Sequence, residues 1–171
     1  ILNKKNFQPL INKDIEKKIN IKNNQFYQKN NITIIFNNGF INIGKNLSKD
    51  FEVSSILESF KLKPKETKEL IKKHNVERTD GIVDLNNAFL NDGLIIKIKK
   101  GVKLDTPISI FFYNSKKLKD ILINNRIYII LEEKAEVEIS EIFLSDKNAS
   151  YWNNIHTFIE LKDKSRLDHY K

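Results

Sequence analysis

Three histidines and several carboxylates are the side chains of this sequence that could together bind a metal ion. His74, His156 and His169 would supply imidazole, with Glu160 or Asp168 as further ligands. His156 and Glu160 are four residues apart and would share one face of a strand. At a rise of ~3.3 Å per residue they would still lie about 13 Å apart, too far to share one ion. We therefore predict no catalytic, cofactor-binding or metal site, expect structural or surface roles for the histidines, and keep only His169 as a candidate metal ligand.

Five glutamates gather around one expected strand, and they could attract cations. They are Glu132, Glu133, Glu136, Glu138 and Glu141. The neighbouring lysines favour the simpler interpretation, a solvated edge in which acidic and basic side chains balance. Glu136 and Glu138 alternate with aliphatic residues, as expected of a strand with one wet and one dry face.

Other chemistries lack the residues they need. The chain has no cysteine, hence no disulfide and no thiol nucleophile. Its five glycines form neither a Walker A loop nor a dinucleotide fingerprint, and no Ser/His/Asp set has a recognisable motif spacing. We predict that the chain is not an enzyme. Trp152, within a Ser-Tyr-Trp-Asn-Asn segment, is expected to close a loop over the core.

Short apolar strands recur with a two-part rhythm in the second half of the sequence. They are expected at residues 108–113, 127–131, 137–143, 155–161 and 166–170, and every second strand recurs after 28 or 29 residues. The phrase Lys-Ala-Glu-Val from Lys134 returns thirty residues later as Lys-Ser-Arg-Leu from Lys164. A fixed period of this length is typical of a stacked solenoid, and a repeat of strands without helices predicts a parallel β-helix. Such a protein usually supplies a surface or scaffold.

The first half of the sequence predicts helices and a hairpin. Apolar residues spaced by four predict an amphipathic helix that begins near residue 9 and ends in an Asn-rich stretch. Residues 32–36 and 40–43, joined by Asn37-Asn38-Gly39, predict a β-hairpin, because Asn-Gly suits the positive φ angles of its turn.

Further elements are expected between residues 51 and 93. Residues 51–57 are expected to be extended, and Pro64 to open a helix over residues 65–74. Asp80 or Asp84 is expected to cap a short helix over residues 85–90, which would end at a turn over residues 91–93. We thus expect an N-terminal α+β region over residues 1–92 and the start of the β-helix over residues 93–171.

Composition limits the functions further. The net charge of +8 would suit a basic β-solenoid that binds an anionic polymer such as nucleic acid, and this remains the alternative function. Only three of the thirty basic residues are arginines, and lysine is a common solubilising surface residue, so we favour other functions. A sugar-processing β-helix enzyme would need a pair of carboxylates that the repeats do not define. The sequence has no run of about 18 apolar residues and no apolar region typical of a signal peptide near residue 1, so we expect a cytoplasmic location, or an organelle stroma of prokaryotic origin.

Several segments, in order, resemble one protein family. Residues 80–93 (DGIVDLNNAFLNDG) lead into residues 94–102 (LIIKIKKGV) and 104–108 (LDTPI). Residues 126–137 (RIYIILEEKAEV), 165–170 (SRLDHY) and, upstream, 34–40 (IIFNNGF) continue the likeness. In this order they resemble the SufB/SufD family of iron–sulfur cluster assembly scaffold proteins, over about residues 32–171.

The resemblance implies a fold and a subtype. The fold would be an α+β region followed by the first coils of a right-handed parallel β-helix. The upstream hairpin and the ending Leu167-Asp168-His169-Tyr170 resemble the SufD type. Proteins of the SufB type carry a Gly-Cys on the strand that here has Phe143, which cannot accept sulfur.

The resemblance also implies partners. The chain would be the N-terminal portion of a non-catalytic SufD-like scaffold subunit, with a SufB-like scaffold partner and a SufC-like ATPase. The complex would assemble the iron–sulfur cluster, the partner would use ATP, and the SufD side would support iron acquisition. Because the chain resembles only the first part of the family, a β-helix cut without a cap would expose strand edges, and we expect the isolated chain to self-associate.

Overall fold

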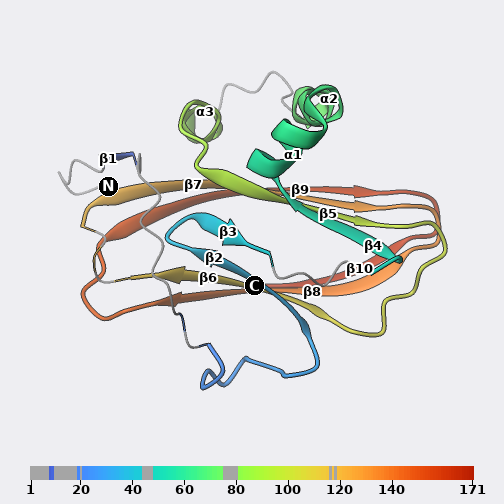
Figure 1. The fold of residues 1–171 in the computed structure, drawn as a ribbon, viewed down its shortest axis with the longest axis horizontal. Helices are drawn as coiled ribbons and strands as arrows, with labels where there is room; N and C mark the ends of the chain where they lie inside the picture. The colour runs from blue at the N-terminus through green and yellow to red at the C-terminus, as the bar shows by residue number, and fades with distance from the viewer. Residues whose placement is uncertain are drawn as a thin grey trace.

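Two mostly parallel β-sheets and a layer of helices make up the described part of the chain (Figure 1). The computed structural model describes residues 8–9, 19, 21–43, 48–74, 81–115, 117 and 119–171. The elements are β1 (Gln8–Pro9), β2 (Ile32–Asn37), β3 (Phe40–Asn42), β4 (Phe51–Ser55), α1 (Ile56–Leu62), α2 (Pro64–His74), α3 (Gly81–Ala88), β5 (Asp92–Ile98), β6 (Ile108–Asn114), β7 (Ile121–Leu131), β8 (Glu136–Ser145), β9 (Tyr151–Leu161) and β10 (Arg166–Tyr170).

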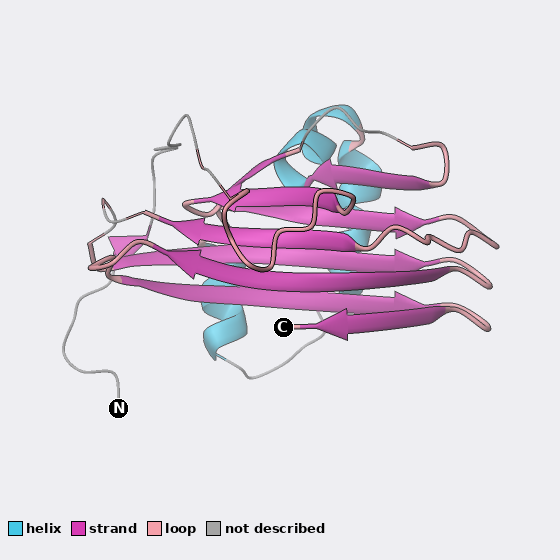
Figure 2. Cartoon of the chain, turned by 90° about the horizontal axis from the view of Figure 1, so that it is seen from below, coloured by secondary structure: helices cyan, strands magenta, loops and turns pink. Residues whose placement is uncertain are grey.

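The chain alternates between the two sheets. The first sheet has the order β1-β7-β5-β4, with β9 paired to β7, and the second has the order β10-β8-β6-β2-β3. All neighbours are parallel except β4 with β5 and β2 with β3. Arg166 lies opposite Glu136, and Tyr151 opposite Ile121, so β8 with β10 and β7 with β9 are paired at an offset of 30 residues. The offset is 31 residues between β6 and β8 and 33 between β5 and β7. Figure 2 shows the strands running side by side as long rungs.

The turns that follow β5, β7 and β9 repeat one geometry. Gly101, Lys134 and Lys164 each have a positive φ, of 72°, 59° and 57°. The Gly101 amide donates to the Glu133 carbonyl at 2.8 Å, and the Lys134 amide donates to the Asp163 carbonyl at 2.9 Å. The repeated phrase in the sequence therefore marks equivalent turns that lie one above the next.

The core lies between the inner faces of the two sheets. Fully buried aliphatic side chains come from alternate positions of β5, β6, β7 and β8, such as Leu94, Ile108 and Ile127. Along the second sheet the rings of Phe36, Phe112 and Phe143 stack in register, with centroids 4.7 Å apart in each pair. Residues of the same type at paired positions of β2, β6 and β8 thus form one stack of rings, which we call the phenylalanine ladder.

The helices of the described residues, α1, α2 and α3, lie on the outer face of the first sheet (Figure 1). The Ser55 hydroxyl accepts the Glu58 amide at 2.9 Å and caps α1, and Pro64 begins α2 as predicted. Asn86, fully buried, fixes α3 to the sheet. Its amide nitrogen donates to the carbonyls of Asn125 and Asn154, at 3.1 and 2.7 Å.

The structure confirms the hairpin, which is β2 and β3, and every strand expected in the second half, although β7 and β9 begin earlier. Some expectations are wrong. Residues 56 and 57 begin α1 and are not extended, because Ser55 caps a helix there. The short helix is Gly81–Ala88, so Asp84 lies within its first turn instead of capping it, whereas Asp80 lies outside the described residues. Asp92 and Gly93 open β5 and do not form a turn.

The expectation for Trp152 is wrong, and the amphipathic helix expected from near residue 9 is largely untested. Trp152 does not close a loop: it lies within β9, opposite Leu122 of β7, and is half-buried. Pro9 belongs to β1, and most of the amphipathic helix expected after it lies outside the described residues. Among the residues that the structure describes, no helix has the length and apolar character needed to cross a membrane.

Candidate functional site

Glu141 places a carboxylate on the inner face of β8, between the two sheets. It continues the inner-facing positions of Val137 and Ile139 and precedes Phe143, so its neighbours along the face are apolar. Its side chain is 0% exposed. An ionised carboxylate in such a place is strongly disfavoured unless cations and hydrogen bonds compensate its charge.

The groups that compensate the charge of Glu141 come from β9, from β10 and from Lys171, which follows β10. His169 Nε2 of β10 lies 2.8 Å from Glu141 Oε1, and Lys171 Nζ lies 3.1 Å from Oε2. From the other sheet, the Thr157 hydroxyl donates to Oε1 at 3.4 Å. Lys171 Nζ also lies 3.5 Å from Thr157 Oγ1. We call Glu141, Thr157, His169 and Lys171 the interior polar cluster; it joins three strands from two sheets.

The cluster lies at the open edge of the sheets. β10 pairs with β8 and β9 pairs with β7, and no described strand pairs with the other side of β9 or β10. Figure 2 shows β10 and the C-terminus at this edge. Inner-facing Phe143, Ile159 and Leu161 are 45%, 44% and 49% exposed here, whereas equivalent residues one strand back are buried. Within the described residues Lys171 is the most exposed member of the interior polar cluster, at 50% side-chain exposure, and Glu141 the least, at 0%.

The other residues considered as metal ligands lie elsewhere. Asp168 points to the outer face of β10, where Arg166 Nη2 donates to it at 2.9 Å. His74 and Glu160 meet on the outer face of the first sheet, with Nε2 and Oε2 3.7 Å apart. His156 lies on the same face as Glu160, as predicted, with its ring against Phe158 at 4.2 Å. Within the described ranges no three His, Asp or Glu side chains converge closely enough to form a ready metal site.

The pKa values of His74 and Glu160 are both lowered, the first by burial and the second by a hydrogen bond. Burial of the His74 ring lowers its pKa below 6.5, against the opposing effect of Glu160. The hydrogen bond from Lys73 Nζ, at 2.7 Å, lowers the pKa of the Glu160 carboxyl. The His74 ring packs against Tyr128 and Phe158, with centroids 5.6 and 5.2 Å away. This geometry attaches α2 to the sheet and indicates a structural role.

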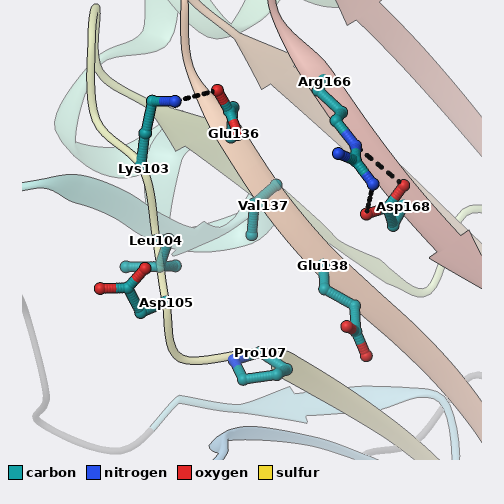
Figure 3. A pocket seen from close by; sticks show the side chains of 9 residues that line it. All are labelled: Lys103, Leu104, Asp105, Pro107, Glu136, Val137, Glu138, Arg166 and Asp168. Atoms are coloured by element: carbon teal, nitrogen blue, oxygen red, sulfur yellow. Dashed lines mark hydrogen bonds and ion pairs between the residues drawn. The ribbon is translucent and has the colours of Figure 1, made fainter.

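A shallow groove crosses the outer face of the second sheet (Figure 3). It has a volume of about 230 Å³, and charged side chains dominate its lining, together with Leu104, Pro107 and Val137. Lys103 Nζ lies 2.6 Å from Glu136 Oε1, and Arg166 pairs with Asp168. Asp168 raises the pKa of Arg166. Oppositely charged pairs in this solvated groove indicate a balanced surface and not a binding site for a charged ligand.

The glutamate cluster divides between surface and interior. Lys97 and Lys162 lie 3.2 and 2.9 Å from the Glu132 carboxylate, and the hydrogen bond from Lys162 lowers the pKa of Glu132. Glu133 pairs with Lys100 at 2.5 Å. The prediction of a lysine-balanced edge is confirmed for these residues and for Glu136. It is wrong for Glu141, which is buried.

Glu141 is the site residue that the sequence interpretation missed. The alternation that put Glu136 and Glu138 on the wet face also puts Glu141, an odd-numbered residue, on the dry face with Val137 and Ile139. That pattern was the available signal. The presence of His169 and Lys171 beside it followed only from the thirty-residue register of β8 and β10.

The fold and the site together define a class: a mixed α/β protein of two mostly parallel sheets, with a polar cluster inside its core and a helical layer outside. The sequence pattern of the SufBD protein N-terminal region matches residues 16–110, more than half of the chain. The chain therefore belongs to the SufBD family, which is involved in iron–sulfur cluster assembly.

A curated relative agrees with this family. An iron–sulfur cluster assembly SufBD family protein of Synechocystis sp. is 23% identical over 147 residues. The match covers 80% of this chain and 32% of the relative, so the chain spans about a third of that protein's length.

Proposed function

We propose that this chain is the N-terminal part of a SufD-type subunit of a SufBCD-type iron–sulfur cluster assembly complex. In that complex it acts as a non-catalytic scaffold, beside a SufB-like subunit and a SufC-like ATPase, and supports cluster assembly and iron acquisition. The family match over residues 16–110 is the observation that carries the proposal. The cluster is the cargo of the complex, and ATP is used by the SufC-like partner.

The family motifs have structural reasons in this chain, which supports the assignment. Asn86, in the motif Leu-Asn-Asn-Ala, joins α3 to β7 and β9 through two backbone carbonyls. A Cβ on Gly93, in the Asp-Gly motif, would lie 2.5 Å from the Arg126 carbonyl oxygen. Both residues are needed where the helical layer meets the sheet.

The SufD type is favoured by the absence of a thiol. Position 143, where the SufB type carries cysteine, holds Phe143, whose ring stacks on Phe112 at 4.7 Å. This residue contributes packing between strands and offers no atom that could accept sulfur.

We further propose that the two sheets are the first coils of a right-handed parallel β-helix. Parallel pairing at a thirty-residue offset, turns of equal geometry and the phenylalanine ladder support it. On this proposal residues 1–92 form the N-terminal region and residues 93–171 the start of the β-helix core. The half-exposed inner side chains at β9 and β10 are the surface on which a further coil would stack.

The proposal is tested by a pull-down in which the full-length protein that contains this chain is tagged and captured from the cells in which it naturally occurs. We expect SufB-like and SufC-like proteins in stable ratio. Because the chain carries a net charge of +8, the capture is repeated at about 0.15 M and 0.5 M salt, where contacts between exposed charges are screened. Absence of both proteins, or their loss at the higher salt, would contradict the proposed complex.

A further inference from the structure

We propose that Asn38 is a site of spontaneous deamidation, which the folded β2–β3 hairpin suppresses and which proceeds when the hairpin opens. Asn38 is followed by Gly39. Glycine favours this reaction, because it has no side chain to hinder the attack of its own amide nitrogen on the asparagine. The inference concerns the covalent lifetime of the chain and does not depend on the proposed complex.

The reaction needs only the chain and water. The Gly39 amide nitrogen loses its proton to water or hydroxide and attacks the Asn38 side-chain carbonyl carbon. The new bond closes a succinimide ring, the bond from that carbon to Nδ2 breaks, and the nitrogen takes up a proton and leaves as ammonia. Water then opens the ring at either carbonyl, which yields aspartate or isoaspartate at position 38.

In the folded chain both ends of the Asn38 side chain are held by hydrogen bonds. Its Oδ1 accepts the Ser115 amide at 2.9 Å, and its Nδ2 donates to the Ser115 hydroxyl at 3.3 Å. Asn38 and Ser115 are each 0% exposed, and Gly39 is buried. Moving the Asn38 side chain onto the Gly39 nitrogen would break these bonds, and burial keeps the water that must take the proton away from Gly39.

The backbone of the turn is held as well. Asn38 and Gly39 form the two-residue loop between the paired residues Asn37 and Phe40, with φ angles of 49° and 81°. The Gly39 carbonyl accepts Asn125 Nδ2 at 2.7 Å, which joins the turn to β7 of the other sheet. The reaction therefore proceeds from a locally opened hairpin, and its rate follows the population of that state.

The products do not fit the folded turn. Isoaspartate adds a methylene to the main chain between residues 38 and 39, so the loop no longer matches the two-residue turn that sets the register of β2 and β3. Aspartate places a carboxylate at a fully buried position, where an ionised group is disfavoured. Either product hinders reclosure, so a deamidation makes the opening of the hairpin irreversible.

The proposal is tested by incubating the full-length protein that contains this chain in mildly alkaline buffer, with and without concentrated urea. Mass spectrometry of proteolytic peptides then follows deamidation at Asn38. We expect the reaction to be at least about tenfold slower without urea, which corresponds to an open state at least about 1.4 kcal/mol above the closed one.

Two variants, each with its folding checked by circular dichroism, locate the contact that suppresses the reaction. Ser115→Ala removes the hydroxyl that accepts Asn38 Nδ2, so it should speed deamidation about 2–10-fold in buffer and leave the rate in urea unchanged. Ser109→Ala is the matched control on β6. It removes a similar bond, from Asn31 Nδ2 to Ser109 Oγ at 3.0 Å, and should leave the Asn38 rate unchanged.

Refolding tests the consequence of the reaction. After the urea is removed, chains modified at Asn38 should be enriched in the fraction that elutes as aggregate from a size-exclusion column. An equal share of modified chains in the folded and aggregated fractions would contradict the claim that the products hinder reclosure.

Three results would overturn the proposal. Equal rates in buffer and in urea would show that the fold does not protect Asn38. Absence of deamidation at Asn38 in urea would show that this Asn-Gly pair is unreactive. Equal acceleration by Ser109→Ala and Ser115→Ala would show that the reaction follows unfolding of the whole chain and not release of Asn38 from Ser115. None of these results would affect the family assignment or the pull-down test.

Discussion

The stacked rings of Phe36, Phe112 and Phe143 predict how much each ring contributes to the free energy of unfolding. Phe112 is the middle ring: it is 3% exposed and stacks on Phe36 and on Phe143, each at 4.7 Å. Phe143 is the end ring, 45% exposed, with Phe112 as its stacking partner. Truncation of the two to alanine should therefore have very different costs.

The magnitudes follow from burial and stacking. Phe112→Ala removes a fully buried ring and leaves a cavity, which costs about 3–5 kcal/mol, and the loss of two stacked contacts places it near the upper value. Phe143→Ala loses roughly half of the burial energy of a phenylalanine and one stacked contact, so about 1–2 kcal/mol. The expected difference in the free energy of unfolding is about 3 kcal/mol.

Urea denaturation followed by far-ultraviolet circular dichroism and by Trp152 fluorescence measures both values. The double variant supplies a control, because two directly stacked rings should show a coupling energy of about 0.5–1.5 kcal/mol. Equal costs for the two single variants would refute the reasoning, since they would mean that Phe143 is as covered as Phe112. In a longer protein of the family, where a further coil is proposed to cover Phe143, its truncation should become as costly as that of Phe112.

Three further predictions concern the helical layer and the surface. Gly93→Ala should destabilise the chain by about 1–3 kcal/mol, because the new Cβ would meet the Arg126 carbonyl oxygen; a thermal melt unchanged from the parent would contradict this. Asn86→Ala should cost about 2–4 kcal/mol and increase hydrogen exchange of α3, because it leaves buried partners without hydrogen bonds; normal protection of α3 would speak against it. His74 has a folded-state pKa below 6.5, so the unfolded chain binds more protons and stability should fall as the pH drops below 6.5; His74→Gln should lack this part of the pH dependence of the melting temperature, and identical pH profiles would contradict it.

Local patterns in the sequence were sufficient for most elements. Alternation of apolar and polar residues locates β6, β8 and β10, Asn38-Gly39 locates the hairpin, and Pro64 locates the start of α2. These signals are local, because side-chain direction in a strand and turn geometry depend on neighbouring residues. Where two local signals compete, as at Ser55, the helix cap ended the strand earlier than the apolar pattern suggested.

The tertiary structure decided which residues meet. Alternation put Glu141 on the face of Val137 and Ile139, but only the pairing of β8 with β10 brought His169 to within 2.8 Å of it. That pairing joins residues thirty apart in the sequence, and its register depends on which core side chains of the two strands share the buried face, which no single segment specifies. The sequence by itself determined the strands, the hairpin and the family motifs. The pairing of distant strands decided that the Glu141 carboxylate meets the His169 imidazole and the Lys171 ammonium group. Local alternation is enough to bury the charge of Glu141, but only groups brought in by long-range packing can compensate it.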